Sequence, residues 1–258
     1  MLLALDIGNT NTVMGVWDSD NLVKHWRIGT VRQRSADELA MLVKQLLSTV
    51  DLSFDHVHFA VLSCVVPPVE WVFVHMLEDY CEIEPLIVGP GIKTGLKIRY
   101  DNPREVGADR IVNAVAALDL HDGPMIVVDF GTATTFDAID STGAYLGGAI
   151  APGINISMEA LFRQASKLPR VPFTRPESVI GKSTTQAMQS GLFFGYVGMV
   201  DEIIQRMSRE LGTDVKILAT GGLGKLISSA SRYIQEVDTL LTLKGLRLIH
   251  ERNSSPRP

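Results

Sequence analysis

Two short stretches each place a carboxylate at the end of an apolar run, before a glycine and small hydroxyl or amide residues. The first is LALDIGNTNTVMGVWD, residues 3–18, and the second is IVVDFGTATTFDAID, residues 126–140. A loop of this composition can hold hydrated Mg²⁺ through its carboxylate while its amides and hydroxyls hydrogen-bond phosphate oxygens. Gly8 and Gly131 leave room for the backbone to approach a phosphate. Both stretches therefore predict contact with phosphate.

A plain hairpin turn explains one such stretch equally well, because Asp, Gly and Asn are turn residues for conformational reasons alone. The two copies share three residue types at one offset of 123 residues: Asp6, Gly8 and Thr12 in the first, and Asp129, Gly131 and Thr135 in the second. Independent turns need not share these positions. The repeat therefore favours a functional interpretation of both loops.

A third group, Asp109 and Arg110, opens the apolar pattern of residues 107–120. Capping and the helix dipole explain an Asp at a helix start. An arginine in the first turn opposes that dipole and more plausibly faces an anion such as a substrate carboxylate. Asp109 could then accept a proton from an alcohol while Arg110 fixes the other end of the same molecule. Phosphoryl transfer asks a protein for this positioning and base catalysis.

These residues need a scaffold, and hydrophobic periodicity predicts one that is built twice. The first half reads as strands at 2–6, 12–17 and 22–28, a helix at 35–50 with Ser35 as N-cap, a strand at 56–65, a helix at 67–80, a strand at 85–89 and a helix at 107–120. The second half reads as strands at 125–130, 134–139 and 145–152, helices at 154–165 and 183–211, and a strand at 215–222. This order predicts two duplicated α/β domains, residues 1–118 and 119–258, with a ligand cleft between them.

Two other glycine-containing motifs do not carry a nucleotide signature. GKST at 181–184 lacks the earlier glycine of a P-loop, since Pro176 stands there, and no strand precedes it. TGGLG at 220–224 follows a strand but lacks the spacing of a dinucleotide site. Gly221 and Gly222 either let something flat approach the backbone or make a plain turn at the end of the strand.

Composition and charge exclude several classes of partner. The 258 residues are 46% hydrophobic and 21% charged, which is ordinary for a globular protein. Lys plus Arg number 24 against 29 Asp plus Glu, a net charge of −5 without a basic run, so we expect no nucleic-acid partner. The opening MLLAL is too short for a signal peptide or a membrane span. We therefore expect a cytoplasmic protein that does not contact a membrane.

Seven motifs in one order resemble a known family. They are DIGNTNTVMGV, LSCVVPP, EVGADRIVNAVAA, VVDFGTATTFD, GGAIAPG, SGLFFGYVGMVD and ATGGLG. Together they resemble the type III pantothenate kinases of the acetate and sugar kinase, Hsp70 and actin superfamily, over residues 2 to about 250. The resemblance implies two ribonuclease H-like (actin-like ATPase) domains, each a mixed five-stranded sheet with flanking helices. It implies ATP-dependent phosphorylation of the primary hydroxyl of pantothenate to 4'-phosphopantothenate, the first step of coenzyme A biosynthesis.

The resemblance also implies a role for each matching residue. By this resemblance, the residues that contact ATP are Asp6, Ile7, Gly8, Asn9, Thr10, Asn11, Thr12, Val13 and Thr132, with Asp6 near Mg²⁺. Pantothenate contacts fall to Tyr100, Gly107, Ala108, Asp109, Arg110 and Thr184, with Asp109 as the proton acceptor. Asp129 matches the ligand of a monovalent cation, K⁺ or ammonium. Members of the family are homodimers.

Two points stay open at this stage. The residues alone let both loop aspartates serve Mg²⁺, whereas the resemblance gives Asp129 to a monovalent cation. A nucleotide-dependent regulatory module of the actin-like superfamily would keep the ATP loops without an acceptor, although it has no need of Asp109 with Arg110. A kinase for a different hydroxy acid is the nearer alternative.

Overall fold

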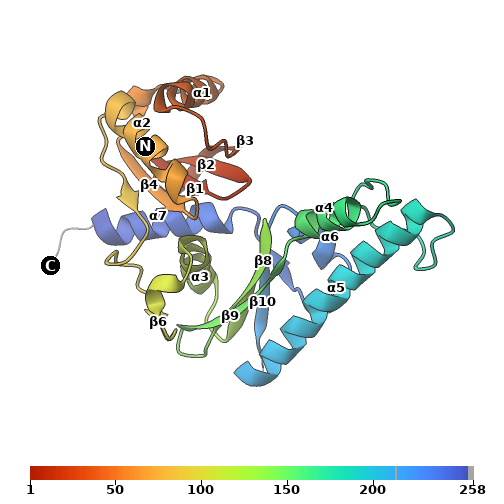
Figure 1. Cartoon of the computed structure of the whole chain (residues 1–258). Coiled ribbons are helices and arrows are strands. Elements are labelled where there is room, and N and C mark those ends of the chain that lie inside the picture. The colour runs from red at the N-terminus through yellow and green to blue at the C-terminus, as the bar shows by residue number, and fades with distance from the viewer. Residues whose placement is uncertain (213, 255–258) are drawn as a thin grey trace. The chain divides into compact units, whose positions relative to one another are not determined.

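The computed structural model describes residues 1–212 and 214–254, which form two compact units (Figure 1). The first unit comprises Met1–Leu96, Asn102–Ala116 and residues 240–254, and the second comprises Lys97–Asp101 and the described residues of the range 117–239. The first unit thus includes a returning C-terminal segment that a single division between residues 118 and 119 leaves out. None of the helices in the described part of the chain has the length and apolar character needed to cross a bilayer.

The sheet of the first unit has the strand order β3-β2-β1-β4-β5. Its members are β1 (Leu2–Ile7), β2 (Asn11–Asp18), β3 (Asn21–Gly29), β4 (Phe59–Cys64) and β5 (Leu86–Ile87). The first three form the antiparallel meander that the alternating sequence predicts. β4 pairs with β1 in parallel, and β5 pairs with β4 in parallel, so the mixed five-stranded sheet is confirmed.

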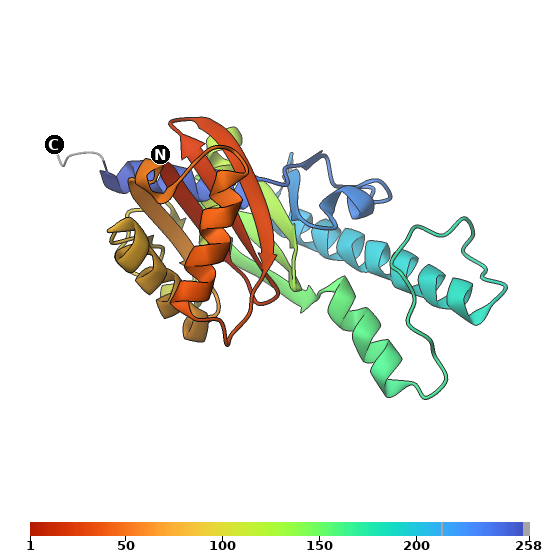
Figure 2. The same cartoon turned by 90° about the horizontal axis from the view of Figure 1, so that it is seen from above.

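Helices cover both faces of this sheet (Figures 1 and 2). On one face α1 (Ala36–Ser48) and α2 (Pro67–Cys81) pack over Leu3, Leu5 and Ile7. The other face, with Leu2 and Ala4, packs against α3 (Ala108–Leu120) and α7 (Leu241–Ser254). Two 3-10 turns, η1 (Phe54–His56) and η2 (Pro103–Glu105), join these elements.

Two local signals of the sequence are confirmed in the first unit. Ser35 caps α1 through its side chain, and the Glu38 carboxylate accepts the Ser35 N–H in return, completing a capping box. Prolines occupy the first turn of α2, where their missing N–H groups have no partner to lose.

The sheet of the second unit has the order β11-β10-β7-β8-β9-β6. Its strands are β6 (Lys97–Ile98), β7 (Met125–Phe130), β8 (Ala133–Ile139), β9 (Ala144–Pro152), β10 (Lys216–Gly221) and β11 (Glu236–Val237). Five of them repeat the strand order of the first unit, as expected of a duplication. The sixth, β6, pairs with the start of β9 at Ala144 and Tyr145 and is too short for periodicity to reveal.

Within the described residues of the second unit, helices follow the third strand of the meander and flank β10 (Figure 2). They are α4 (Ile154–Gln164), α5 (Thr184–Leu211) and α6 (Gly224–Ser228). α5 lays Phe193, Val200 and Ile204 against the sheet residues Ile126 and Val128. The core of the second unit is therefore built between strand β7 and helix α5.

Candidate active site

The first aspartate loop is a tight hairpin turn between β1 and β2. The Gly8 N–H donates to the Asn11 carbonyl at 3.1 Å, and a Cβ at Gly8 would lie 3.0 Å from that oxygen. The loop is also tied to the end of β3, because the Thr30 N–H donates to the Thr10 carbonyl at 3.0 Å. The Thr12 and Thr30 hydroxyls are 2.9 Å apart. The loop is thus held by a hydrogen bond within it and by Thr30, which contacts both Thr10 and Thr12.

Asp6 is the last residue but one of β1, just before this loop, and its carboxylate is partly buried. The Ser63 hydroxyl donates to Asp6 Oδ1 at 2.9 Å. Burial raises the pKa of Asp6 to about 6; the Ser63 hydrogen bond lowers it, the negative charge of Asp109 raises it, and the positive charge of Arg27 lowers it. Asp6 and Asp109 are therefore close enough for their charges to interact.

Asp109 lies in the first turn of α3, and its side-chain carboxylate folds back close to the backbone of its neighbours Gly107 and Arg110. Its Oδ1 accepts the Arg110 N–H at 2.9 Å, and a Cβ at Gly107 would lie only 2.5 Å from the same oxygen. Burial raises the pKa of Asp109 while the Arg110 backbone and charge lower it. Arg110 itself is 7% exposed. The segment 107–110 thus combines a carboxylate of raised pKa with a buried arginine.

The second aspartate loop, in the other unit, is one residue shorter than the first. Ile7 pairs with Thr12 across the first loop, whereas Phe130 pairs with Thr134 across the second. The structural equivalent of Thr12 is therefore Thr134, not Thr135 as the constant offset suggests. Both are buried, and the Thr134 hydroxyl is hydrogen-bonded to the Tyr196 hydroxyl. The Thr equivalence inferred from the sequence is corrected by this difference in loop length.

Asp129 is the last residue but one of β7 and Thr132 lies on the loop that follows, and other backbone segments approach both closely. A Cβ at Gly153 would lie 2.1 Å from the Thr132 carbonyl oxygen. Gly221, with φ of +87°, lies against Asp129: a Cβ there would be 2.6 Å from both Asp129 Oδ1 and the Phe130 carbonyl oxygen. Gly221 therefore leaves room for the end of β7, the strand that pairs with β10 at this point.

Tyr100 and Thr184 also belong to the second unit. The Tyr100 ring lies over β9, since Gly147, with φ of +120°, would place a Cβ 3.0 Å from Tyr100 Cε2. Its centroid is 6.4 Å from that of Tyr145. Thr184 is the exposed first residue of α5, which Ser183 caps through its side chain. GKST is thus a helix start preceded by coil, in agreement with its exclusion as a P-loop.

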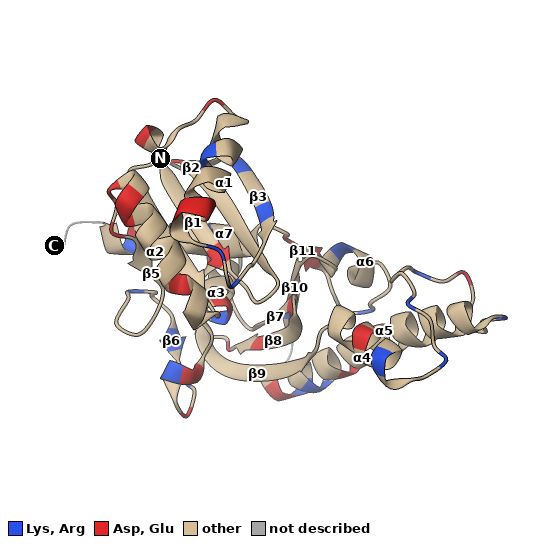
Figure 3. Cartoon of the chain, turned by 45° about the horizontal axis from the view of Figure 1, so that its top comes forward, with Lys and Arg blue, Asp and Glu red and all other residues tan. Residues whose placement is uncertain are grey.

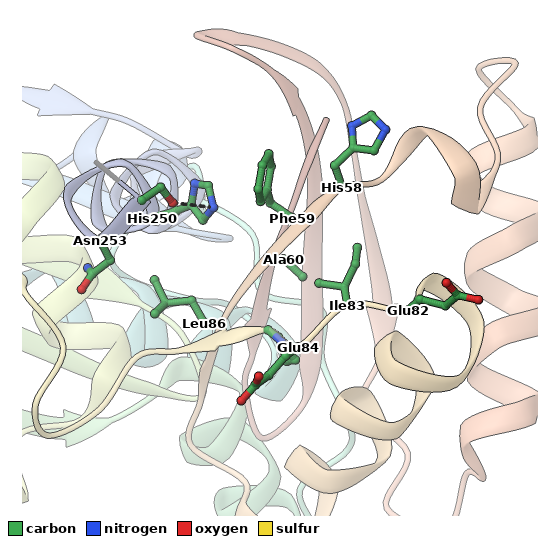
Figure 4. A pocket seen from close by; sticks show the side chains of 11 residues that line it. His58, Phe59, Ala60, Glu82, Ile83, Glu84, Leu86, His250 and Asn253 are labelled. Atoms are coloured by element: carbon green, nitrogen blue, oxygen red, sulfur yellow. Dashed lines mark hydrogen bonds between the residues drawn. The ribbon is translucent and has the colours of Figure 1, made fainter. Parts of the chain in front are cut away.

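A pocket of about 480 Å³ in the first unit contains none of the predicted residues (Figure 4). It lies where β4 and β5 begin and α7 ends, whereas the aspartate loop follows the end of β1. Figure 4 shows Phe59 beside His250, and Glu84 below them in the lower part of the view. The ring centroids of Phe59 and His250 are 5.2 Å apart. Since it holds neither Asp6 nor Asp109, this pocket is not the candidate active site.

Two residues near the first loop escaped the sequence analysis. Ser63 lies inside the quoted LSCVVPP motif, where a single hydroxyl residue in an apolar strand was the available signal. Thr30 gave no signal, because only the fold brings the end of β3 to the loop. Over residues 1–212 and 214–254, no group of three or more His, Cys, Asp and Glu side chains could hold a metal ion.

Comparison with known proteins identifies the family. The family model for type III pantothenate kinase matches residues 2–206. A type III pantothenate kinase from Myxococcus xanthus (strain DK1622) is 56% identical over 253 residues, covering 98% of this chain and 99% of the relative. The chain belongs to the type III pantothenate kinase family. A second member, from Exiguobacterium sp. (strain ATCC BAA-1283 / AT1b), is 55% identical over the same length, with the same coverage of both chains.

Solved structures support the fold of this kinase. A structure described as a Baf family transcriptional activator from Campylobacter jejuni has a TM-score of 0.60 at 22% identity, covering 97% of this chain and 98% of that one. The ethanolamine utilization protein EutJ from Carboxydothermus hydrogenoformans has a TM-score of 0.57 at 16% identity, covering 96% and 89%. These likenesses concern the fold alone, an actin-like ATPase fold of two α/β units.

Family membership settles the reaction class that the sequence left open. The kinase uses ATP to phosphorylate pantothenate, the first step of coenzyme A biosynthesis. The expected enzyme class is confirmed, and the regulatory module and the kinase for a different hydroxy acid are set aside.

Proposed function

We propose that Asp109 is the general base of the kinase and that the segment 107–110, with Tyr100 and Thr184, binds pantothenate. The observation that supports this assignment is that the negative charge of Asp109 raises the pKa of Asp6, so the proposed proton acceptor interacts with a residue of the proposed phosphate loop. Burial raises the pKa of Asp109, and a carboxylate with a raised pKa is a stronger base.

The proposed reaction is an in-line transfer. The pantothenate hydroxyl oxygen attacks the γ-phosphorus of ATP, the bond from that phosphorus to the bridging oxygen breaks, and ADP leaves with the electron pair. The hydroxyl proton passes to Asp109. Since Asp109 Oδ1 already accepts the Arg110 N–H, Oδ2 is the atom that takes the proton. Arg110 holds the pantothenate carboxylate, in keeping with the geometry of a guanidinium.

The ATP site in this proposal consists of the loop 6–13 and Thr132, and Asp6 would hold Mg²⁺. The fit rests on two partly buried carboxylates, Asp6 and Asp109, whose negative charges interact. A divalent cation with oxygen ligands relieves that repulsion. When bound, the ion neutralises charge on the phosphates.

Asp129 would hold the monovalent cation, K⁺ or ammonium. Its Oδ1 and the Phe130 carbonyl oxygen both approach Gly221, where a Cβ would lie 2.6 Å from each, so the carboxylate and a carbonyl oxygen face the same glycine. Hard cations prefer carboxylate and carbonyl oxygens. We expect full activity in potassium or ammonium buffer and a reduced rate in sodium-only buffer. Equal rates in all three would contradict the assignment.

Asp109→Asn tests the general base. We expect kcat for pantothenate phosphorylation to fall by about 10²- to 10⁴-fold, while ADP binding measured by calorimetry stays within about twofold. Asp119→Asn is the matched control, because Asp119 is exposed near the other end of the same helix. A near wild-type kcat for Asp109→Asn would show that another group accepts the proton.

A homodimer, which the family resemblance implies, and a location in the cytoplasm complete the proposal. The surface that supports a dimer is apolar: β9 contains no charged residue (Figure 3), and Ile150 on it is 65% exposed. Val179 and Ile180, in the segment before α5, are 64% and 80% exposed. Sedimentation velocity should show a dimer for the native chain and a weakened one for Ile150→Glu. A native monomer at micromolar concentration contradicts the proposal.

A further inference from the structure

Arg27 on β3 lies in one row with Asp6 across the sheet of the first unit. Asp6 pairs with Ser63 on β4 and with Val13 on β2, and Val13 pairs with Arg27. Side chains of directly paired residues point to the same face of a sheet. One more row, Ile7 with Thr12, Ile28 and Cys64, lies between it and the phosphate loop, and its side chains Ile7, Ile28 and Cys64 belong to the α1 and α2 core. On its own face of the sheet the Asp6 row is therefore the last one before the loop, beside the proposed ATP site.

Burial on the neighbouring positions fixes which face Arg27 occupies. Trp26 and Ile28 pack against the core under α1 and α2, and alternation along a strand therefore points Arg27 to the opposite face. That face carries Asp6 and the start of α3. The positive charge of Arg27 already lowers the pKa of Asp6, which agrees with this placement.

The guanidinium of Arg27 is available to a ligand. Arg27 is exposed, and within residues 1–212 and 214–254 its guanidinium forms no hydrogen bond or ion pair. Its strand is fixed relative to the loop, because Thr30, three residues further along, is bonded to Thr10 and Thr12. A solvated arginine on an anchored strand can reach an anion held by the loop without much reordering of the backbone.

We infer that Arg27 binds the polyphosphate chain of ATP, at the edge of the phosphate loop opposite Ser63. This inference rests on the proposed assignment of the loop 6–13 to ATP. The polyphosphate is strongly anionic, and guanidinium groups bind phosphate oxygens with two parallel hydrogen bonds. In this inference Arg27 on β3 contributes a cation and Asp6 on β1 would contribute the metal ligand, so the two act on the same phosphates from either side of β2.

Arg27→Gln and Arg27→Lys test the inference, with Lys24→Gln as the matched control. Lys24 is exposed on the same strand and pairs with Val16, which faces the α1 and α2 core, so it carries an equal charge on the other face. We expect Arg27→Gln to weaken ATP binding by roughly tenfold to a hundredfold, the effect of a lost charge-assisted hydrogen bond. Arg27→Lys should recover part of the loss, and Lys24→Gln should change binding by less than about twofold. KM for pantothenate should stay unchanged.

Calorimetric ATP binding in EDTA separates a direct contact from an effect through Asp6. If Arg27 touches phosphate, the loss persists without Mg²⁺. If Arg27 acts only by keeping Asp6 ionised, binding without Mg²⁺ is unchanged, and the inference is wrong. Gly8→Val, which blocks the approach of a phosphate to the loop backbone, tests the assignment of the loop to ATP separately from the role of Arg27. ATP binding lost in Gly8→Val but intact in Arg27→Gln overturns the role of Arg27 alone, whereas binding intact in both overturns the assignment of the loop.

Discussion

Replacing Asp6 by Asn should stabilise the metal-free kinase at neutral pH while removing its activity. Burial raises the pKa of Asp6 from 3.8 to about 6, so ionising this carboxylate costs more free energy in the folded protein than in the unfolded chain. Asparagine removes the charge and keeps an oxygen that accepts the Ser63 hydroxyl. Residues that function by holding a charge in a buried site commonly lower stability in this way.

The sign and size of the effect follow from linkage. The unfolded chain loses the Asp6 proton near pH 3.8 and the folded protein near pH 6, so between these values the folded state binds more protons. The free energy of unfolding therefore falls as pH rises through this window. At 1.36 kcal/mol per pH unit, the interval corresponds to about 3 kcal/mol. The penalty is complete above pH 6 and absent below pH 3.8, and Asp6→Asn lacks it at every pH.

Tryptophan fluorescence in urea with EDTA measures this effect in the right part of the molecule. The three tryptophans, Trp17, Trp26 and Trp71, all lie in the first unit with Asp6, so their signal reports on the unfolding of that unit. The stability gain of Asp6→Asn should be about 3 kcal/mol at pH 7 to 8 and should shrink to nothing near pH 4.

Asp18→Asn serves as the control, because Asp18 is exposed at the end of β2 and its replacement should leave the unfolding free energy nearly unchanged. A gain for Asp6→Asn that is the same at pH 4 and pH 8 would falsify the reasoning. A loss of stability at pH 8 would contradict it equally.

Three further substitutions probe the surroundings of the site. Gly147→Ala places a Cβ 3.0 Å from the Tyr100 ring at a φ of +120° and should raise KM for pantothenate several-fold while leaving KM for ATP unchanged; steady-state kinetics with each substrate varied checks this, and a change in the ATP constant alone would contradict it. Gly221→Ala brings a Cβ to 2.6 Å from Asp129 Oδ1 and should abolish the stimulation by K⁺, so a stimulation equal to that of the native enzyme would refute the proposed cation site. Thr30→Val removes a 2.9 Å hydroxyl contact to the phosphate loop, worth about 1 kcal/mol, and should raise KM for ATP by about fivefold; an unchanged constant would show that the loop is held without it.

The sequence alone predicts much of the local structure and of the chemistry. Alternation and turn residues give the two meanders, and the Ser35 capping box gives the start of α1, because these features depend on neighbours along the chain. The repeated aspartate motif, together with the similar hydrophobic pattern of the two halves, predicts the duplicated strand order, because similar hydrophobic patterns favour similar strands and helices. The family resemblance, carried by seven motifs over nearly the whole chain, is confirmed by the comparisons.

Pairing between distant segments was decided by the tertiary structure. β6 and β11 have two residues each, too few for a period, and they exist as strands because β9 and β10 offer them partners. The return of α7 to the first unit depends on close contact with α3, where a Cβ at Gly245 would lie 2.2 Å from the Val112 carbonyl oxygen.

The site divides along the same line. Asp6, Asp109 and Asp129 could be named from the sequence, because a carboxylate at a strand end or a helix start is visible in one dimension. The register of the ladders then decided what surrounds them: it set Ser63 against Asp6 and aligned Thr134, not Thr135, with Thr12. Register is fixed by the burial of whole strands and by loop length. Both depend on many residues at once, so the sequence around a single site residue does not reveal its cross-strand partner.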